Sequence, residues 1–202
     1  MFKRILTAAC AVILLLTGCG SDYSDAQVEV PSNWAEYTVE NMDFRFEAGW
    51  KSGNWDNVMA ETDKQAGTIG TNNNLAVFGR LVAPTSAQDT TNYMDFGYWE
   101  MGHQVETVEL EALMEPINDL LLHIKKTGIE SNDLQSSRIR FYGEVEALTC
   151  SYQLEKERVT CVMQMALIPH GSRVYFICLS DFTTGEDNSM LEQLLSTLSF
   201  ND

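Results

Sequence analysis

The stretch that decides the fold is RIRFYGEVEALTCSYQLEKERVTCVMQMALIPHGSRVYFICLSD, residues 138–181. It contains three runs rich in apolar and aromatic residues, at roughly 144–154, 158–168 and 173–180, with short polar breaks between them. Runs of this kind, bounded by turn residues, are typical of β-strands. Because parallel neighbours need a long crossover connection, breaks this short join antiparallel strands. The stretch therefore predicts a three-stranded antiparallel meander.

Two-residue alternation assigns the side chains of this meander to two faces. If both hairpins close symmetrically, one face carries only apolar, aromatic and thiol side chains: Leu148, Cys150, Tyr152, Val159, Cys161, Met163, Met165, Leu167, Val174, Phe176 and Cys178. Three independent alternations that agree on one face support the assignment. The opposite face is mixed, and its apolar members indicate that a helix covers part of it: Val162, Ala166, Ile168 and Ile177.

Cys150 and Cys161 are a candidate disulfide. If the first hairpin turns at Glu155-Lys156, the two cysteines lie directly opposite each other, with Cβ atoms about 4.5–5.5 Å apart. A disulfide needs about 3.8 Å, so the bond requires some adjustment. Cys178 is then expected opposite Met163, as a competing partner for Cys161. Free cysteine also serves as a small hydrophobic residue in a core, and we favour three buried free thiols over the bond.

Working outward, alternation predicts further strands at about 34–39, 42–46, 75–82 and 93–101. A short helix is expected to begin near Asn54. The period becomes helical over 108–126, where Pro116 is expected to kink the helix, and the apolar stripe is Leu110, Leu113, Met114, Ile117, Leu121 and Ile124. A capping box at Ser189–Glu192 starts a last helix with the stripe Leu191, Leu194, Leu195 and Leu198. Hairpins with helices inserted or appended indicate an α+β fold, an antiparallel β-sheet with helices packed on it.

The order of these elements resembles the PsbP-like fold over residues 36–202. The resemblance rests on Phe44-x-Phe46-x-x-Gly49-Trp50, a middle helix, a meander led by Gly143, the strand Val174-Tyr175-Phe176-Ile177 and a final helix ending in Leu198-Ser199-Phe200. The proline that often precedes the Gly-Trp pair is replaced by Glu47-Ala48. Extrinsic photosystem proteins, a Ran-binding nuclear import factor and many small bacterial lipoproteins share this fold. The resemblance implies an α/β/α sandwich but no single activity, although the best-known members of the fold bind partners rather than catalyse. It transfers no site residue.

The N-terminus has the order of a lipoprotein signal peptide. Lys3 and Arg4 precede an apolar run from Ile5 to Leu16, which is too short to span a bilayer. Leu16-Thr17-Gly18-Cys19 then resembles the lipobox of bacterial lipoproteins, which implies cleavage after residue 18 and lipid on Cys19. The alternative is an ordinary secretory signal in which Cys19 is incidental. We expect a signal peptide at 1–18, an acidic flexible tether at 19–33 and one domain at 34–202, held on the extracytoplasmic face of a cell membrane.

Composition restricts the partners. The chain has 13 Lys and Arg against 29 Asp and Glu, and removal of residues 1–18 takes away two cations, which leaves a net charge of −18. Such a field repels phosphate backbones, so we expect no nucleic-acid partner. No zinc-ligand spacing, nucleophile elbow, phosphate loop or calcium loop is present, and the three histidines (His103, His123 and His170) are far apart in sequence. We therefore expect no metal and no cofactor.

The segment Tyr93–Met101 carries large aromatic side chains on both faces of its predicted strand. Tyr93 and Trp99 lie on one face, and Phe96 and Tyr98 on the other. We prefer the interpretation of a central strand covered on both faces. The alternative is that these four residues form a surface for a ligand or partner, because exposed aromatic side chains favour binding.

Two functions of different class remain. The first is a membrane-anchored accessory module that binds an unidentified protein or small ligand without catalysis, and the second is an extracytoplasmic enzyme with an unrecognised active site. The sequence shows no convergent set of nucleophile, base and metal ligand, which favours the binding module.

Overall fold

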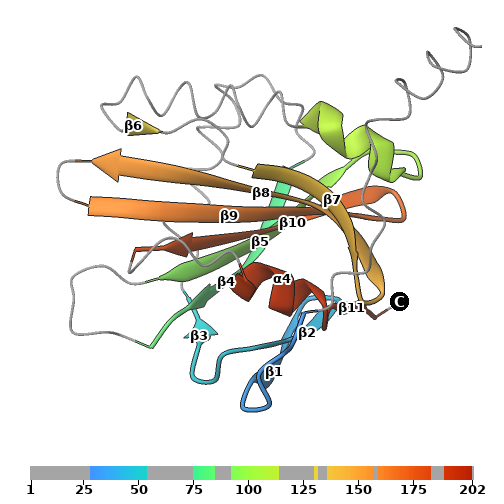
Figure 1. The fold of residues 1–202 in the computed structure, drawn as a ribbon. Coiled ribbons are helices and arrows are strands. Elements are labelled where there is room, and N and C mark those ends of the chain that lie inside the picture. The colour runs from blue at the N-terminus through green and yellow to red at the C-terminus, as the bar shows by residue number, and fades with distance from the viewer. Residues whose placement is uncertain are drawn as a thin grey trace, which may run out of the picture.

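A long antiparallel sheet organises the domain. The structure is a computed structural model and describes residues 28–53, 75–84, 92–113, 130–131, 136–156, 159–182 and 189–201. The strand order of this large sheet is β3 (Lys51–Ser52), β4 (Leu75–Val82), β5 (Tyr93–Glu100), β10 (Arg173–Asp181), β9 (Val159–His170), β8 (Val145–Lys156) and β6 (Glu130–Ser131). β7 (Ser136–Tyr142) pairs with the same edge of β8 as β6 does. Figure 1 shows β8, β9, β10 and β5 side by side.

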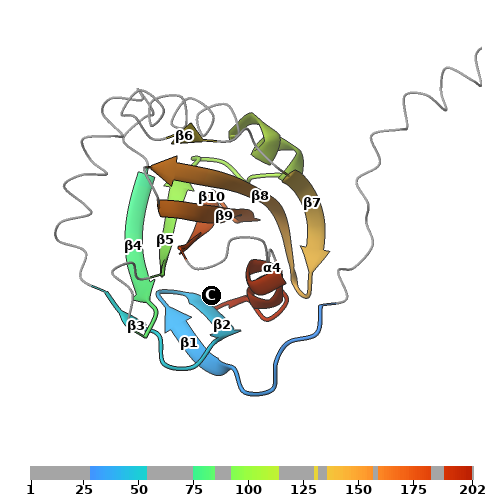
Figure 2. The same cartoon turned by 60° about the vertical axis from the view of Figure 1, so that its left-hand side comes forward.

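A second, smaller sheet closes the open side of the large one. It has the antiparallel order β1 (Ala35–Val39), β2 (Met42–Phe46) and β11 (Ser199–Phe200). Helix α4 (Ser189–Leu195) lies between the two sheets, and Figure 2 shows the large sheet curving around it. A 3₁₀-helix, η1 (Thr107–Leu113), packs against β8 and β9 on the other face of the large sheet. The described chain is therefore mostly antiparallel sheet with one α-helix.

The first core fills the space between the two sheets. α4 contributes its predicted stripe, since Leu191, Leu194 and Leu195 are buried, and Leu198 after the helix is buried too. The small sheet contributes alternate residues of β2: Met42, Phe44 and Phe46. The large sheet contributes residues of β5, β9 and β10, among them Met94, Phe96, Ala166, Ile168 and Ile177. This confirms the prediction that a helix covers part of the mixed face of the meander.

The second core lies on the opposite face of the large sheet, under η1. It contains the predicted single-face set of the meander: Leu148, Cys150, Tyr152, Met165, Leu167, Val174, Phe176 and Cys178, together with Val105 and Leu110. The face assignment is therefore confirmed for these residues. Hydrophobic side chains on both faces of one sheet also explain why its central strands read as nearly continuous apolar runs.

The predicted register of the first hairpin is wrong. Cys150 lies opposite Met165, and Cys161 lies opposite Leu154. The strands continue to the pair Lys156 and Val159, so Glu155 and Lys156 belong to β8 and not to the turn. The shift is four residues, an even number, so every side chain keeps its face while its partner changes.

The remaining expectations have mixed outcomes. The last helix is confirmed over 189–195, but Ser199–Phe200 forms a strand and not the end of the helix. The helix expected over 108–126 begins as the 3₁₀-helix η1, and 114–126 lie outside the described residues. The expected helix near Asn54 also lies outside them. Four strands were not anticipated: β3, β6, β7 and β11.

Candidate functional site

Five aromatic rings from five strands meet where the two sheets approach each other. We name this set the aromatic cluster: Phe78 of β4, Tyr98 of β5, His170 of β9, Tyr175 of β10 and Phe200 of β11. The imidazole of His170 stacks on Phe200 with ring centroids 4.1 Å apart and an interplanar angle of 9°. Tyr175 is the centre of the cluster, with its ring 4.9 Å from Phe200, 5.6 Å from Tyr98 and 6.3 Å from Phe78.

Local backbone features position these rings. The register between β4 and β5 shifts between Val77 and Gly79, so Phe78 is the extra residue of a β-bulge. A bulge changes the direction of a side chain, and here the ring of Phe78 lies 5.8 Å from that of Tyr98. His170 pairs with Arg173 across a two-residue loop in which Gly171 has φ +60°, as the first residue of a tight hairpin requires.

A polar rim borders the cluster. The guanidinium carbon of Arg173 lies 4.2 Å from the centroid of the Tyr98 ring, and its Nε donates to Glu100 Oε2 at 2.9 Å. Ser172 Oγ donates to the other oxygen of Glu100 at 2.6 Å. Asn41 Nδ2 donates to Tyr175 Oη at 3.2 Å, which connects the small sheet to the large one. Tyr175 itself is buried, whereas the side chains of Arg173 and Glu100 are 38% and 40% exposed.

The electrostatics of the rim keep both charges in place. The hydrogen bond from Ser172 and the ion pair with Arg173 lower the pKa of Glu100 below its ordinary value. The hydrogen bond to Tyr175 and the pair with Glu100 raise the pKa of Arg173 above its ordinary value. Both groups are therefore charged at any physiological pH. The rim presents a fixed cation stacked on an aromatic face, with a fixed anion beside it.

The structure separates the four aromatic residues that were considered as one surface. Phe96 is fully buried and stacks on Phe44 of β2 with centroids 5.5 Å apart. Trp99 packs on the other face of the sheet, 4.9 Å from Phe176. Tyr93 lies near Arg80, whose guanidinium is 4.3 Å from its ring centroid. Of the four residues, only Tyr98 belongs to the aromatic cluster. β5 lies between β4 and β10, so it is a central strand, as the preferred interpretation expected.

The three cysteines of the described chain are free and buried. Because Cys150 and Cys178 both pair with Met165, they are two strand spacings, about 10 Å, apart. Cys161 lies four residues from Met165 along β9. It is therefore displaced by about 13 Å, along the strand direction, from the position at which Cys150 and Cys178 pair with Met165. A disulfide needs Cα atoms within about 7 Å, so the candidate bond between Cys150 and Cys161 is not present. The cause is the register shift described above.

Burial also makes these thiols unreactive. It raises the pKa of Cys150 and of Cys161 to about 11, and it raises that of Cys178 further. Within the described ranges, no group of three or more His, Cys, Asp or Glu side chains is close enough to hold a metal ion. His103 pairs with Glu109 at 3.0 Å, His170 stacks on Phe200, and His123 lies outside the described residues.

Sequence reasoning did not find most of the aromatic cluster. Phe78 depends on a bulge, and Phe200 depends on a two-residue strand at the end of the chain, neither of which periodicity shows. The one signal in the sequence was that Arg173 and Tyr175 alternate on the same face of a strand directly after a turn. Cys19 lies outside the described residues, and no helix among those described is long and apolar enough to cross a membrane.

Comparisons with known proteins give structural neighbours only. The sequence matches no protein-family model and no curated protein. The solution structure of cyanobacterial PsbP (CyanoP) from Synechocystis sp. PCC 6803 matches with TM-score 0.56 and 11% identity, over 90% of this chain and 100% of that one. A crystal structure from Bacteroides thetaiotaomicron matches with TM-score 0.45 and 9% identity, over 80% of this chain but 45% of that one. A protein of unknown function from Pseudomonas aeruginosa matches with TM-score 0.37 and 10% identity, over 75% of this chain and 85% of that one. The match to CyanoP shows that the domain has a PsbP-like fold.

Proposed function

We propose that this protein is a lipid-anchored, extracytoplasmic binding or accessory module without catalytic activity. The observation that carries the proposal is the order of the N-terminus: two cations, an apolar run of signal-peptide length, and then Leu16-Thr17-Gly18-Cys19. The mature chain then carries lipid on Cys19 and acts at the outer face of a cell membrane.

The position of the first described residues is consistent with a short connection between lipid and domain. Gln193 Nε2 on α4 donates to the backbone oxygen of Glu29 at 3.1 Å, and Val30 packs against the first core. Contacts of the described chain with the core and with α4 therefore begin at Glu29 and Val30, within the tether expected at 19–33. The chain from Cys19 to Glu29 reaches at most about 35 Å, so a partner would be bound close to the membrane surface.

The aromatic cluster is the contact surface that we infer for the partner. Its four half-buried rings (Phe78, Tyr98, His170 and Phe200) are fixed by packing around the buried ring of Tyr175, so they lose little conformational entropy when another surface covers them. Aromatic residues and arginine are enriched in the parts of interfaces that carry binding energy, and the cluster offers both at its half-exposed rim. The partner is a protein or a small ligand. Nucleic acid is excluded by the charge of −18.

We also propose that the helical stripe of 108–126 continues from η1 over the second core. Leu110 of η1 is fully buried in that core and is the first member of the stripe. A helix in this position completes the α/β/α sandwich that the PsbP-like fold implies.

Labelling with a fatty acid in a bacterial host tests the anchor. Wild-type protein is expected to incorporate the label and to be digested by a protease added outside the cytoplasmic membrane. Cys19→Ala is expected to lose the label, and Cys161→Ala is the matched control that keeps it. Equal label in wild type and Cys19→Ala rejects lipid anchoring at this cysteine.

Photo-crosslinking tests the contact surface independently of the anchor. A benzoylphenylalanine residue at Arg173 places the reactive group at the rim of the cluster, and the same residue at exposed Glu36 on β1 is the control. The proposal expects one discrete adduct from residue 173 and none from residue 36. Adducts at both positions or at neither contradict a contact surface at the aromatic cluster.

A further inference from the structure

Glu40 lies in a strained turn at the end of the small sheet. β1 and β2 pair up to Val39 and Met42, so Glu40 and Asn41 are the two residues of their hairpin loop. Glu40 has φ +55° and is the one non-glycine residue with a positive φ in the described ranges. Glycine is usual at such a position, because a Cβ atom crowds the following carbonyl oxygen in this backbone conformation. The turn therefore keeps a glutamate where a smaller residue would be less strained.

This turn borders the aromatic cluster. Asn41 Nδ2 donates to Tyr175 Oη at 3.2 Å, and the backbone oxygen of Asn41 accepts from the N–H of Asn201, directly after Phe200. The loop thus contacts the centre of the cluster and the strand that contributes one of its outer rings. Glu40 itself is exposed, and none of the described residues forms a hydrogen bond or an ion pair with its carboxylate. This carboxylate is therefore available to a group of another molecule.

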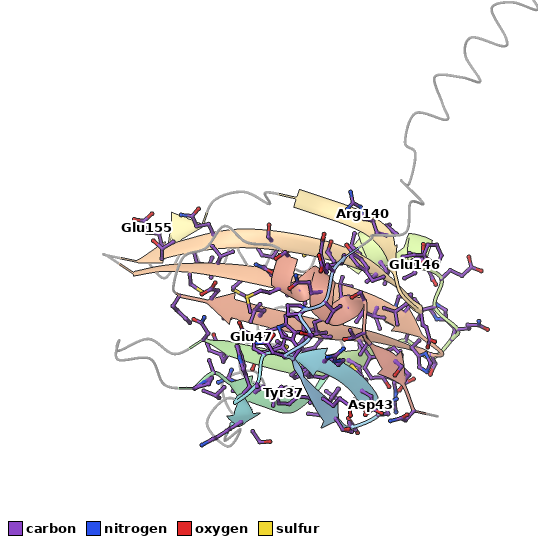
Figure 3. All side chains as sticks on the ribbon, turned by 60° about the horizontal axis from the view of Figure 1, so that its bottom comes forward. Tyr37, Asp43, Glu47, Arg140, Glu146 and Glu155 are labelled. Carbon is purple, nitrogen blue, oxygen red and sulfur yellow. The ribbon has the colours of Figure 1, made fainter. Side chains whose placement is uncertain are left out.

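The charges near the turn favour a cation. Figure 3 shows Asp43, the next acid along the chain, beside β1 and β2. Hydrogen bonds from Thr38 and Asn201 lower the pKa of Asp43, so it is charged at neutral pH. Across the cluster, Glu100 accepts from Arg173. Together with the carboxylate in the turn, these groups are three acids and one guanidinium that is already paired, in a mature chain with a net charge of −18. Such a field attracts basic partners and speeds their association.

The rim of the cluster already holds one cation in this way. The guanidinium of Arg173 lies over the ring of Tyr98, and the carboxylate of Glu100 accepts a hydrogen bond from it. An aromatic face and a carboxylate thus bind the charge together. A side chain from another molecule can make the same two contacts wherever a half-exposed ring lies close to an available carboxylate.

His170 and Phe200 lie close to such a carboxylate. Their rings are half-buried and stacked, and Phe200 pairs with Met42, which follows the turn directly. We propose that Glu40 and these two rings bind a lysine or arginine side chain of a basic protein partner. The methylene groups of that side chain cover the rings, and its charge lies at Glu40. The inference rests on the contact surface proposed above and names the chemistry of the partner.

An NMR titration tests the inference on the unlipidated mature chain, residues 19–202 with Cys19→Ala, labelled with ¹⁵N. The probes are the peptide acetyl-Lys-Phe-Lys-amide and the same peptide with both lysine amines acetylated. At low salt, the basic peptide is expected to shift the amide signals of Asn41 and Phe200 saturably. It is also expected to bind at least about ten times more tightly than the acetylated peptide. Equal binding of the two peptides, or no shift of these signals, overturns the inference.

Glu36 provides the matched control, because it is an exposed glutamate on β1 and its replacement removes the same charge. Glu40→Gln is expected to weaken binding of the basic peptide at least about threefold, and Glu36→Gln by less than about 1.5-fold. Equal weakening in the two variants overturns the inference, since net charge alone would then explain the binding. Putrescine has the same two positive charges as the peptide. If it binds as tightly, the ligand is a diffusible diamine and not a protein, which also overturns the inference.

Glu40→Gly separates binding from folding. It removes the strain and the carboxylate together, so it is expected to be at least as stable to urea as wild type but to bind the basic peptide as weakly as Glu40→Gln does. Unchanged binding by Glu40→Gly overturns the inference. Photo-crosslinking from residue 173 distinguishes this failure from a failure of the contact surface. An adduct whose yield is unchanged by Glu40→Gln rejects the role of Glu40 and leaves the contact surface in place.

Discussion

The ring of Phe176 on β10 lies against the backbone of Gly97 on β5, its direct partner across the two strands. A Cβ atom at position 97 would lie less than 3.0 Å from two carbons of that ring and from the carbonyl oxygen of Ala76 on the other side. Both neighbours are fixed, one by core packing and one by the sheet. We expect Gly97→Ala to lower the free energy of unfolding by about 1–3 kcal/mol, as overpacking does in a tight core. Urea unfolding followed by tryptophan fluorescence measures it.

Gly171 provides the matched control for this prediction. It has φ +60°, and nothing lies within 4 Å of the position of its Cβ. Asparagine tolerates this backbone conformation better than other non-glycine residues. Gly171→Asn meets no neighbouring atom but keeps the strain of a positive φ at a non-glycine residue, so it is expected to lower the free energy of unfolding by about 1 kcal/mol. A loss at Gly97 no larger than that at Gly171 would show that Phe176 moves aside.

The register of β8, β9 and β10 predicts the redox state of the cysteines. In the unlipidated mature chain with Cys19→Ala, thiol titration after denaturation without reductant is expected to give three thiols, from Cys150, Cys161 and Cys178. The native protein is expected to give almost none at pH 8, because burial keeps these thiols protonated. One thiol in the denatured sample, with the other two lost to a disulfide, contradicts the register.

The hairpin of β8 and β9 shows which structural features periodicity can predict and which it cannot. Alternation assigns each side chain of the meander to a face, and it did so correctly because burial acts on faces. It does not assign partners, which depend on where the strands turn. The charged run from Glu155 to Arg158 resembles a loop, yet Glu155 and Lys156 extend β8. The turn position therefore could not be read from polarity alone.

The sequence pattern could not predict very short strands, or sites formed by residues that are far apart in the sequence. β6 and β11 have two residues each, and β11 forms only because Ser199 and Phe200 pair with β2. The aromatic cluster needs that pairing to bring Phe200 to His170. It also needs the bulge at Phe78, which is a property of the paired strands and not of one strand. The antiparallel sheet and the C-terminal helix, in contrast, depend on local patterns and were predicted.

The ion pair between Arg80 and Asp95 lies on the face of the large sheet that carries the second core, and it gives a prediction about stability. Arg80 Nε and Nη2 donate to the two carboxylate oxygens at 2.5 and 2.7 Å, and the same guanidinium lies over the ring of Tyr93. The side chains are only 17% and 20% exposed. Lysine keeps the charge but loses the two-point geometry and the stacking. We expect Arg80→Lys to lower the free energy of unfolding by about 1–2 kcal/mol.

An exposed pair serves as the comparison for Arg80. Arg173 and Glu100 form a similar contact, but their side chains are 38% and 40% exposed. Pairs of this exposure contribute about 0–1 kcal/mol, so Arg173→Lys should cost less than Arg80→Lys. Equal losses in the two variants, measured by urea unfolding at the same salt concentration, would show that burial does not govern the strength of these pairs.

Alkaline pH is expected to destabilise the fold through its buried thiols. Desolvation raises the pKa of Cys150 and Cys161 from 9.0 to about 11 in the folded protein, and it also raises the pKa of Tyr152. A group with a raised folded pKa stabilises the fold fully below the unfolded pKa, so this contribution is lost as the pH rises from about 9 to about 11. At pH 10 the loss is about 1 kcal/mol for each of the two thiols. Cys150→Ala/Cys161→Ala is expected to be less stable than wild type at pH 7 because of the cavities, but to lose less stability between pH 8 and pH 10. Urea unfolding at each pH measures the two slopes, and equal slopes would mean that the thiols ionise as easily in the folded protein as in the unfolded chain.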